Sequence, residues 1–168
     1  AQTFMTKNLA NFSSEVLGRV SGDIKNNAIF NLATQFGGGK THALTLLYHL
    51  FQHGNKAKKW TGVRGILSDS GVTQIPEANI GIFVGTEFDS IAGRGSKGEP
   101  KRFTPWGELA YQIGGAKGFK IVEEHDKKKI APGGDILSKL IPEDEPTIIL
   151  IDELMNYMSR SRVIKLTD

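Results

Sequence analysis

The sequence predicts a three-layer α/β fold, with helices packed on a mostly parallel sheet. Short apolar runs at 28–33, 78–84 and 147–151 are typical of buried strands. Segments whose apolar residues recur at helical spacing separate these runs, and such an alternation favours a parallel sheet. Glycine, with 20 of 168 residues, is concentrated in the turns between the segments.

Length and composition limit the class of protein. A chain of 168 residues with 39% hydrophobic and 23% charged residues is typical of one globular domain. Its apolar runs are too short to span a membrane, and residues 1–11 do not have the form of a secretory signal. The absence of cysteine excludes disulfides and suits a cytoplasmic protein. A net charge of +3 is too small to indicate nucleic-acid binding by itself.

The first half of the chain is expected to alternate helices and strands. The first helix ends at Ser21-Gly22-Asp23, and its apolar spacing favours plain packing on the core over a role in holding a nucleotide base. A solvated basic loop is expected at 53–59. The elements predicted in this half are helices at 4–20, 43–51 and 60–67 and strands at 28–33 and 78–84.

The second half begins with a glycine-rich and basic segment, 90–102, which we expect to be a flexible loop. Thr104 as N-cap and Pro105 at the first helical position predict a helix start, and Gly114-Gly115 predicts its end. Asp135 is expected to cap a later helix. The remaining predictions are a helix or strand at 119–129, a helix at 136–141 stopped by Pro142, and the third strand at 147–151.

The segment 34–41, Thr-Gln-Phe-Gly-Gly-Gly-Lys-Thr, has the form of a phosphate-binding P-loop, although Thr34 replaces the usual first glycine. It lies between a predicted strand and a predicted helix, so backbone N–H groups and the helix dipole would form an anion site. Lys40 would reach the β- and γ-phosphates, and the Thr41 hydroxyl would bind Mg²⁺. The residues predicted to bind the nucleotide are Thr34, Gln35, Phe36, Gly37, Gly38, Gly39, Lys40, Thr41 and His42. A glycine-rich turn with a chance lysine is the alternative, which the agreement of strand, loop and helix disfavours.

A second chemical signal is the run Thr-Ile-Ile-Leu-Ile-Asp-Glu at 147–153. Its apolar part predicts a parallel strand buried on both faces, and acids at the carboxyl end of such a strand lie where open α/β sheets bind ligands. This is the Walker B pattern, in which Asp152 would bind Mg²⁺ and Glu153 would orient or deprotonate the attacking water. We therefore predict Glu153 and Lys40 as catalytic residues. A strand followed by a helix with an acidic first turn is the alternative.

Several motifs together resemble a prokaryotic family of large AAA+-like P-loop ATPases, often encoded near restriction–modification and phage-defence genes. The motifs that carry this resemblance are Phe36-Gly37-Gly38-Gly39-Lys40-Thr41-His42, Leu47-Tyr48-His49-Leu50, Val84-Gly85-Thr86, Thr104-Pro105-Trp106-Gly107-Glu108 and Leu150-Ile151-Asp152-Glu153-Leu154. The resemblance implies binding and hydrolysis of ATP, a requirement for Mg²⁺, and a role in DNA-directed defence. Specificity for ATP rests on the resemblance alone, because no guanine-reading motif is evident.

Two functions are compatible with these features. The first is a Mg²⁺-dependent ATPase that drives a remodelling step. The alternative is a nucleotide-controlled module that binds DNA or protein and hydrolyses little, motivated by the basic segments 56–59 and 94–102. A homo-oligomer is compatible with either function.

The resemblance also predicts that residues 1–168 form only the N-terminal portion of an ATPase domain, from Walker A to Walker B. In the hydrolytic branch of P-loop proteins, a further strand that senses the γ-phosphate lies between the P-loop strand and the Walker B strand, and a helical lid follows. Neither is expected in these residues, so the fragment should hydrolyse ATP poorly. Arg160 and Arg162 are interpreted as helix-end charges rather than an arginine finger.

Overall fold

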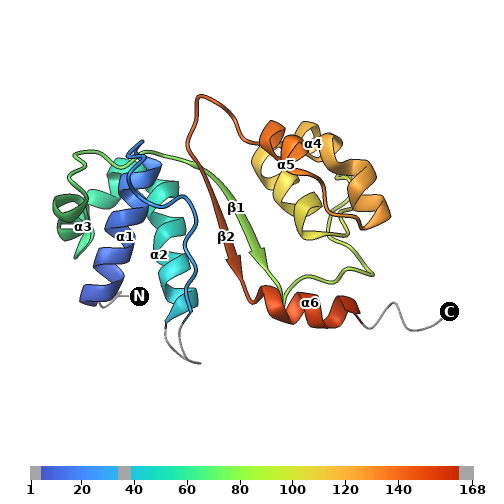
Figure 1. The fold of residues 1–168 in the computed structure, drawn as a ribbon, viewed down its shortest axis with the longest axis horizontal. Helices are drawn as coiled ribbons and strands as arrows, with labels where there is room; N and C mark the ends of the chain where they lie inside the picture. The colour runs from blue at the N-terminus through green and yellow to red at the C-terminus, as the bar shows by residue number, and fades with distance from the viewer. Residues whose placement is uncertain (1–4, 34–38, 163–168) are drawn as a thin grey trace. The chain divides into compact units, whose positions relative to one another are not determined.

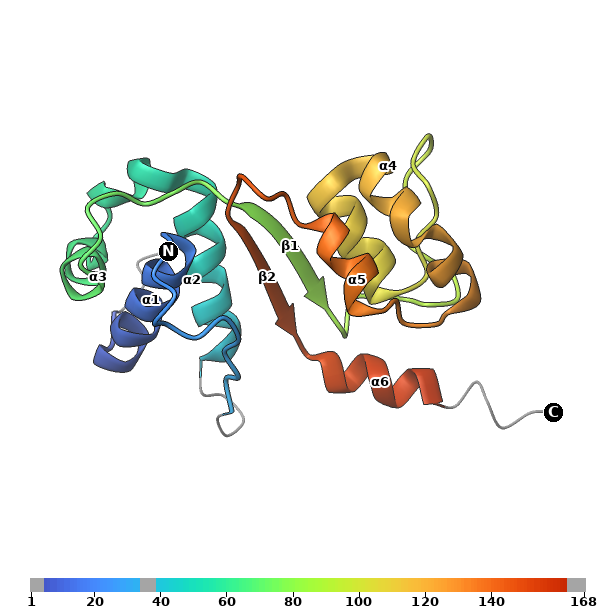
Figure 2. The same ribbon diagram turned by 45° about the horizontal axis from the view of Figure 1, so that its top comes forward.

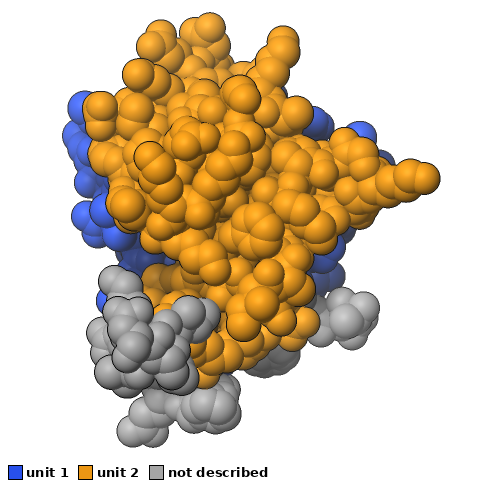
Figure 3. Space-filling view, turned by 90° about the vertical axis from the view of Figure 1, so that its right-hand side faces the viewer, with its two compact units in different colours: residues 1–79 blue, residues 80–168 orange. Residues whose placement is uncertain are grey.

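A computed structural model describes residues 5–33 and 39–162. The chain divides into two compact units, residues 1–79 and residues 80–168 (Figure 3). No helix in the described parts of the chain is long and apolar enough to cross a bilayer.

The first unit is helical (Figure 1). Thr6 caps its first helix by accepting a hydrogen bond from the Leu9 N–H at 3.3 Å. The Ser14 hydroxyl donates to the Ile66 carbonyl oxygen at 3.2 Å and so joins the first helix to the third. The elements are α1 (Lys7–Val20), α2 (Lys40–His53), the 3₁₀ helix η1 (Gly54–Lys59) and α3 (Val63–Ser70). The three predicted helices are confirmed, whereas the loop expected at 53–59 is mostly a 3₁₀ helix.

The strand predicted at 28–33 is wrong, because these residues form no helix or strand. Ile29 is 88% exposed, and the N–H of Ala33 bonds only locally, to the carbonyl oxygen of Asn31 at 3.2 Å. Phe30 packs edge-on against Phe12 of α1, with ring centroids 5.6 Å apart. An apolar run becomes a strand only where a neighbouring strand pairs with its backbone, and this run packs an aromatic ring on a helix instead.

The second unit contains a two-stranded parallel sheet (Figure 1) of β1 (Asn79–Val84) and β2 (Thr147–Asp152). Both strands agree with the sequence prediction. The expected burial of β2 on both faces is wrong, since Ile148 and Leu150 are buried but Ile149 and Ile151 are each 44% exposed. The protein is thus a mixed α/β structure with a small parallel sheet.

Helix α4 (Pro105–Lys128) packs against β1, as two views of the ribbon show (Figures 1 and 2). Thr104 caps it, accepting from the Gly107 N–H at 3.1 Å, and Pro105 is its first residue, as predicted. Gly115, with φ 59° and ψ −150°, breaks the helical geometry where the sequence predicted an end. The second half of α4 covers 119–128, so the open choice between helix and strand is decided in favour of helix.

The outer edge of β1 is closed by a side chain of α4. The Ile82 N–H donates to Gln112 Oε1 at 2.7 Å, and Gln112 Nε2 donates to the Ile82 carbonyl oxygen at 3.0 Å. The Gln112 amide therefore takes the two bonds that another strand would make at this point.

Short elements follow α4 in the second unit. They are α5 (Gly134–Leu137), the 3₁₀ helix η2 (Ser138–Leu140) and α6 (Leu154–Arg162). Gly133, and not Asp135, occupies the N-cap of α5, so the predicted capping role of Asp135 is wrong, and the helix expected at 136–141 is divided between α5 and η2. Leu140 of η2 packs with Ala110, Phe119 and Val122 of α4 in a buried cluster.

The segment expected to be a flexible basic loop is a closed hairpin. The Arg94 N–H donates to the Arg102 carbonyl oxygen at 2.8 Å, and the Arg102 N–H returns a bond at 2.9 Å. The Arg102 side chain is only 4% exposed, bonds Glu108 at 2.8 Å, and lies 4.1 Å from the centre of the Tyr111 ring. Burial lowers the pKa of Arg102, but the hydrogen bonds and charges of Glu108 and Glu99 together raise it by more, so the pKa lies above its ordinary value. The sequence prediction failed here because this pairing depends on contacts with α4.

Candidate functional site

The two predicted acids lie at the carboxyl end of β2, beside the end of β1. The Gly85 N–H donates to the Asp152 carbonyl oxygen at 2.9 Å, which extends the pairing of the strands to their last residues. The Asp152 carboxylate accepts from the Glu153 N–H at 3.0 Å through Oδ1. Glu153 has a left-handed φ of 53°, so the chain turns sharply at this residue before α6 begins.

Gly85 permits the close approach of the two strand ends. A Cβ atom at this position would collide with the carbonyl oxygen of Glu153 and would lie 3.2 Å from Tyr157 Cβ. Thr86 follows directly and is exposed. The rim of the sheet therefore presents Thr86 together with Asp152 and Glu153, at the edge where parallel sheets bind ligands.

Helix α6 is fixed to the end of β1 by Arg160. Its guanidinium group donates to the carbonyl oxygens of Gly85 and Phe88, the second at 3.3 Å. Arg160 was expected to be a simple helix-end charge, and the structure gives it this specific structural role. The described part of the chain includes the backbone of Arg162 but not its side chain.

An aromatic cluster supports the same region. The rings of Phe83, Phe88 and Tyr157 lie 5.3 to 6.0 Å apart, in tilted and edge-on pairs. Burial raises the pKa of the Tyr157 phenol, since the ionised form would be poorly solvated there. The cluster joins β1, the segment after it and α6 into one packed body.

The predicted phosphate-binding residues lie at the start of α2, in the other unit. Gly39 caps this helix with a left-handed φ of 77°, and the first turn contains no acid. Lys40, Thr41 and His42 form the first turn, where N–H groups and the helix dipole favour an anion. The predicted residues Thr34, Gln35, Phe36, Gly37 and Gly38 lie outside the described residues.

The structure brings Asp152 and Glu153 together at one sheet edge, and it places Lys40 and Thr41 on the separate first unit. Within the described ranges, no cluster of three His, Asp or Glu side chains could hold a metal. The predicted Mg²⁺ ligands, a threonine hydroxyl and a carboxylate, are nevertheless hard oxygen donors of the type that this ion prefers.

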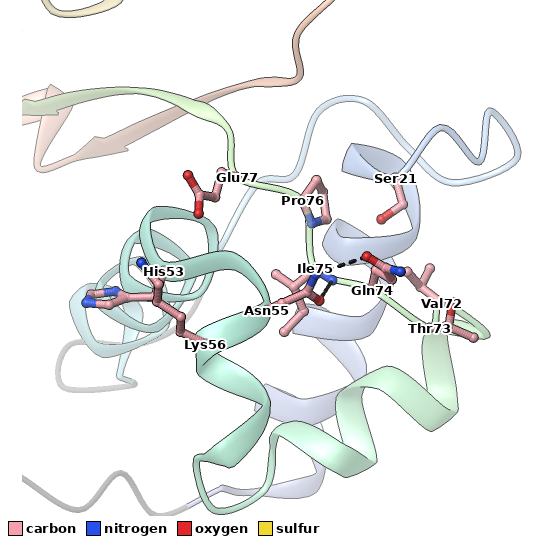
Figure 4. Close-up of a pocket in the computed structure, with 10 residues that line it drawn as sticks. All are labelled: Ser21, His53, Asn55, Lys56, Val72, Thr73, Gln74, Ile75, Pro76 and Glu77. Carbon is pink, nitrogen blue, oxygen red and sulfur yellow. Dashed lines mark hydrogen bonds between the residues drawn. The ribbon is translucent and has the colours of Figure 1, made fainter.

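A separate open hollow of about 600 Å³ lies in the first unit (Figure 4). His53, Asn55 and Lys56 line one side of it, and residues 72–77 line another. The Asn55 side chain already makes hydrogen bonds within the protein: its amide nitrogen donates to Gln74 at 3.0 Å, and its oxygen accepts from the Ile75 N–H at 2.9 Å. None of the residues predicted from the motifs lines this hollow.

Sequence reasoning missed Asn156, and it did not predict the structural roles of Gly85 and Arg160. Asn156 donates a hydrogen bond to the Glu153 carboxylate. Two weak signals existed in the sequence: a glycine directly after an apolar strand, and an amide three residues after the acid pair.

Neither the curated proteins nor the solved structures that were compared show a match to this chain. Residues 1–166 match the DUF499 N-terminal domain, which covers nearly the whole sequence. The chain therefore belongs to the DUF499 N-terminal domain family.

Proposed function

We propose that this chain carries the nucleotide-binding and catalytic residues of a Mg²⁺-dependent, AAA+-like P-loop ATPase. The observation that carries the proposal is the pair Asp152 and Glu153 at the carboxyl end of a parallel strand, directly beside the end of a second strand. This is the edge at which α/β sheets bind ligands, and a carboxylate pair there suits phosphoryl transfer.

The proposal gives each residue a separate task. Lys40 and the backbone N–H groups at the start of α2 bind the phosphates. Thr41 and Asp152 would be the residues that hold Mg²⁺, and the bound ion would supply positive charge to the β- and γ-phosphates. Glu153 accepts a proton from the attacking water while the water oxygen bonds to the γ-phosphorus. The bond from that phosphorus to the β,γ-bridging oxygen breaks, so that ADP and phosphate leave.

The edges of the two-stranded sheet are compatible with the AAA+-like form of the proposal. Gln112 closes the outer edge of β1, whereas the outer edge of β2 is not paired with another strand in the described residues. The resemblance expects a further strand beside the Walker B strand. β2 has its unpaired edge on the side where such a strand would fit.

The alternative, a nucleotide-controlled DNA-binding module, has less support from the segment 94–102. Arg102 is buried against Glu108, and Arg94 contacts Glu108 at 3.7 Å and donates to the Glu87 carbonyl oxygen at 2.9 Å. Both guanidinium groups therefore already bind acceptors of the protein itself. Lys56 and Lys59 of η1 remain exposed and keep this alternative open.

Glu153→Gln in the purified full-length protein tests the proposal. The amide keeps the shape of the side chain but cannot accept the proton, so we expect ATP turnover to fall at least 100-fold, about the share that a general base contributes. Binding of a fluorescent ATP analogue should stay within about twofold of the wild type, because Glu153 does not hold the phosphates.

Glu143→Gln is the matched control, since Glu143 is an exposed acid in the loop before β2. It should leave turnover unchanged. Wild-type turnover in Glu153→Gln would show that the assignment is wrong.

A further inference from the structure

The first turn of α6 contacts the carboxylate of Glu153. Asn156 Nδ2 donates a hydrogen bond to Glu153 Oε2 at 2.5 Å, and the Asn156 backbone N–H donates to the Glu153 carbonyl oxygen at 3.0 Å. Among the described residues, the other carboxylate oxygen, Oε1, receives no hydrogen bond. One oxygen is therefore held by an amide, and the other is left to accept a proton.

We infer that Asn156 is a positioning residue, which sets the direction of the Glu153 carboxylate for the attack of water. The inference rests on the proposed ATPase function, and it adds a residue that neither P-loop nor Walker B motif includes. An exposed glutamate samples several rotamers, and a general base is effective only when it is aimed at the proton it removes. A fixed amide donor removes most of that freedom.

Asn156 can act in this way because α6 itself is held in place. Tyr157 packs on Phe83 and Phe88, with ring centroids 5.3 and 6.0 Å away. Arg160, one helical turn beyond Asn156, donates to two backbone carbonyl oxygens at and after the end of β1. These contacts hold the helix against the end of β1 and the residues after it, so the amide of Asn156 has a defined position relative to the strand ends.

A purely structural role predicts a different response to mutation. If Asn156 only stabilised the helix start, Asn156→Asp would be harmless or stabilising, because an acid in the first turn is favoured by the helix dipole. If Asn156 aims Glu153, the same change is damaging, since it replaces the donor by a second negative charge beside the first.

The test compares Asn156→Asp, Asn156→Ala and Met155→Ala in the full-length protein. Met155 is the preceding residue of α6 and is 72% exposed, so it is a matched control for truncation in the same turn. We expect kcat for ATP to fall about tenfold or more in both Asn156 variants, with KM and the Kd of a fluorescent ATP analogue unchanged within about twofold. Met155→Ala should keep wild-type kcat.

A second readout needs no nucleotide. The side-chain amide protons of Asn156, followed by NMR, should shift on Glu153→Ala and stay in place on Glu143→Ala. Wild-type turnover in Glu153→Gln would overturn the proposed function and the inference with it. Loss of turnover in Glu153→Gln with normal kcat in both Asn156 variants would overturn the inference alone, as would a loss of nucleotide affinity equal to the loss of kcat.

Discussion

At the scale of single residues, Gly85 determines how closely the two strand ends can approach. Its backbone lies against the carbonyl group of Glu153, in a space that no side chain could share. Glu153 is itself in a left-handed conformation that non-glycine residues adopt at some cost. The position of Glu153, the proposed catalytic acid, therefore depends on Gly85, which lies 68 residues earlier in the sequence.

Gly85→Ala should destabilise the second unit, since the added methyl group must displace the turn at Glu153. We expect a loss of about 1–3 kcal/mol in the free energy of unfolding, the usual cost of overpacking, measured by urea denaturation. Gly114→Ala is the control, because a Cβ there meets no atom within 4 Å and Gly114 lies in α4. That control should be neutral or stabilising. Equal stability of the two variants would contradict the close contact at Gly85.

At the scale of elements, the predictions that rested on local signals were correct, and those that depended on long-range contacts failed. The Thr104 cap, Pro105 and the break at Gly115 were predicted correctly, because the chemistry of a helix start or end is contained within a few residues. The run 28–33 has strand-like composition but no pairing partner in the described residues. Composition alone could not show this, since a strand is completed by another part of the chain.

The hairpin 94–102 is a second element that its own sequence does not specify. Glycine and basic residues suggested a mobile loop, whereas Arg102 is buried and bonded to Glu108, Glu99 and the Pro100 carbonyl oxygen. The stem of the hairpin is thus joined to α4 by a buried ion pair. A sequence pattern shows charge but not burial, and burial converts this loop into a fixed element.

Arg102→Ala should therefore unfold the hairpin and lower stability far more than removal of a neighbouring cation. It leaves the Glu108 carboxylate buried without its main charge partner, a loss that typically costs about 3–5 kcal/mol. Lys101→Ala, at the exposed adjacent position, should change the free energy of unfolding by less than about 0.5 kcal/mol. Urea denaturation of the two variants compares these losses, and a similar small effect for both would show that the ion pair contributes little.

At the scale of the whole molecule, the sequence predicted candidate site residues but not the architecture. The acid pair and the lysine–threonine pair were found by motif, because each is a short local pattern at the end of a strand or the start of a helix. Division of the chain into two compact units was not predicted, since no linker or change of composition marks residue 79. The contacts of Asn156 and Arg160 were also unpredictable, because they depend on the angle at which α6 leaves the sheet.

Acid pH should destabilise the second unit through carboxylates whose pKa values are lowered in the folded state. Backbone N–H groups of Ile91 and Ala92 lower the pKa of Asp89, and the Ser96 N–H followed by Arg102 lowers that of Glu99. A group with a lowered pKa binds fewer protons when folded, so its stabilising contribution is complete above its ordinary pKa and is lost as the pH falls through the folded value. Ordinary values of 3.8 for Asp89 and 4.5 for Glu99 place the start of this loss near pH 5.

A tryptophan reporter makes the acid effect measurable within the second unit. The chain contains two tryptophans, and Trp60→Phe leaves Trp106 of α4 as the only one. In this variant, the urea midpoint followed by Trp106 fluorescence should fall steadily between pH 5 and pH 3. Adding Glu99→Gln removes one titrating group and should make the decline shallower, whereas Glu143→Gln is an exposed-acid control. A decline of equal slope with and without Glu99 would mean that its contacts with Ser96 and Arg102 do not stabilise the folded hairpin.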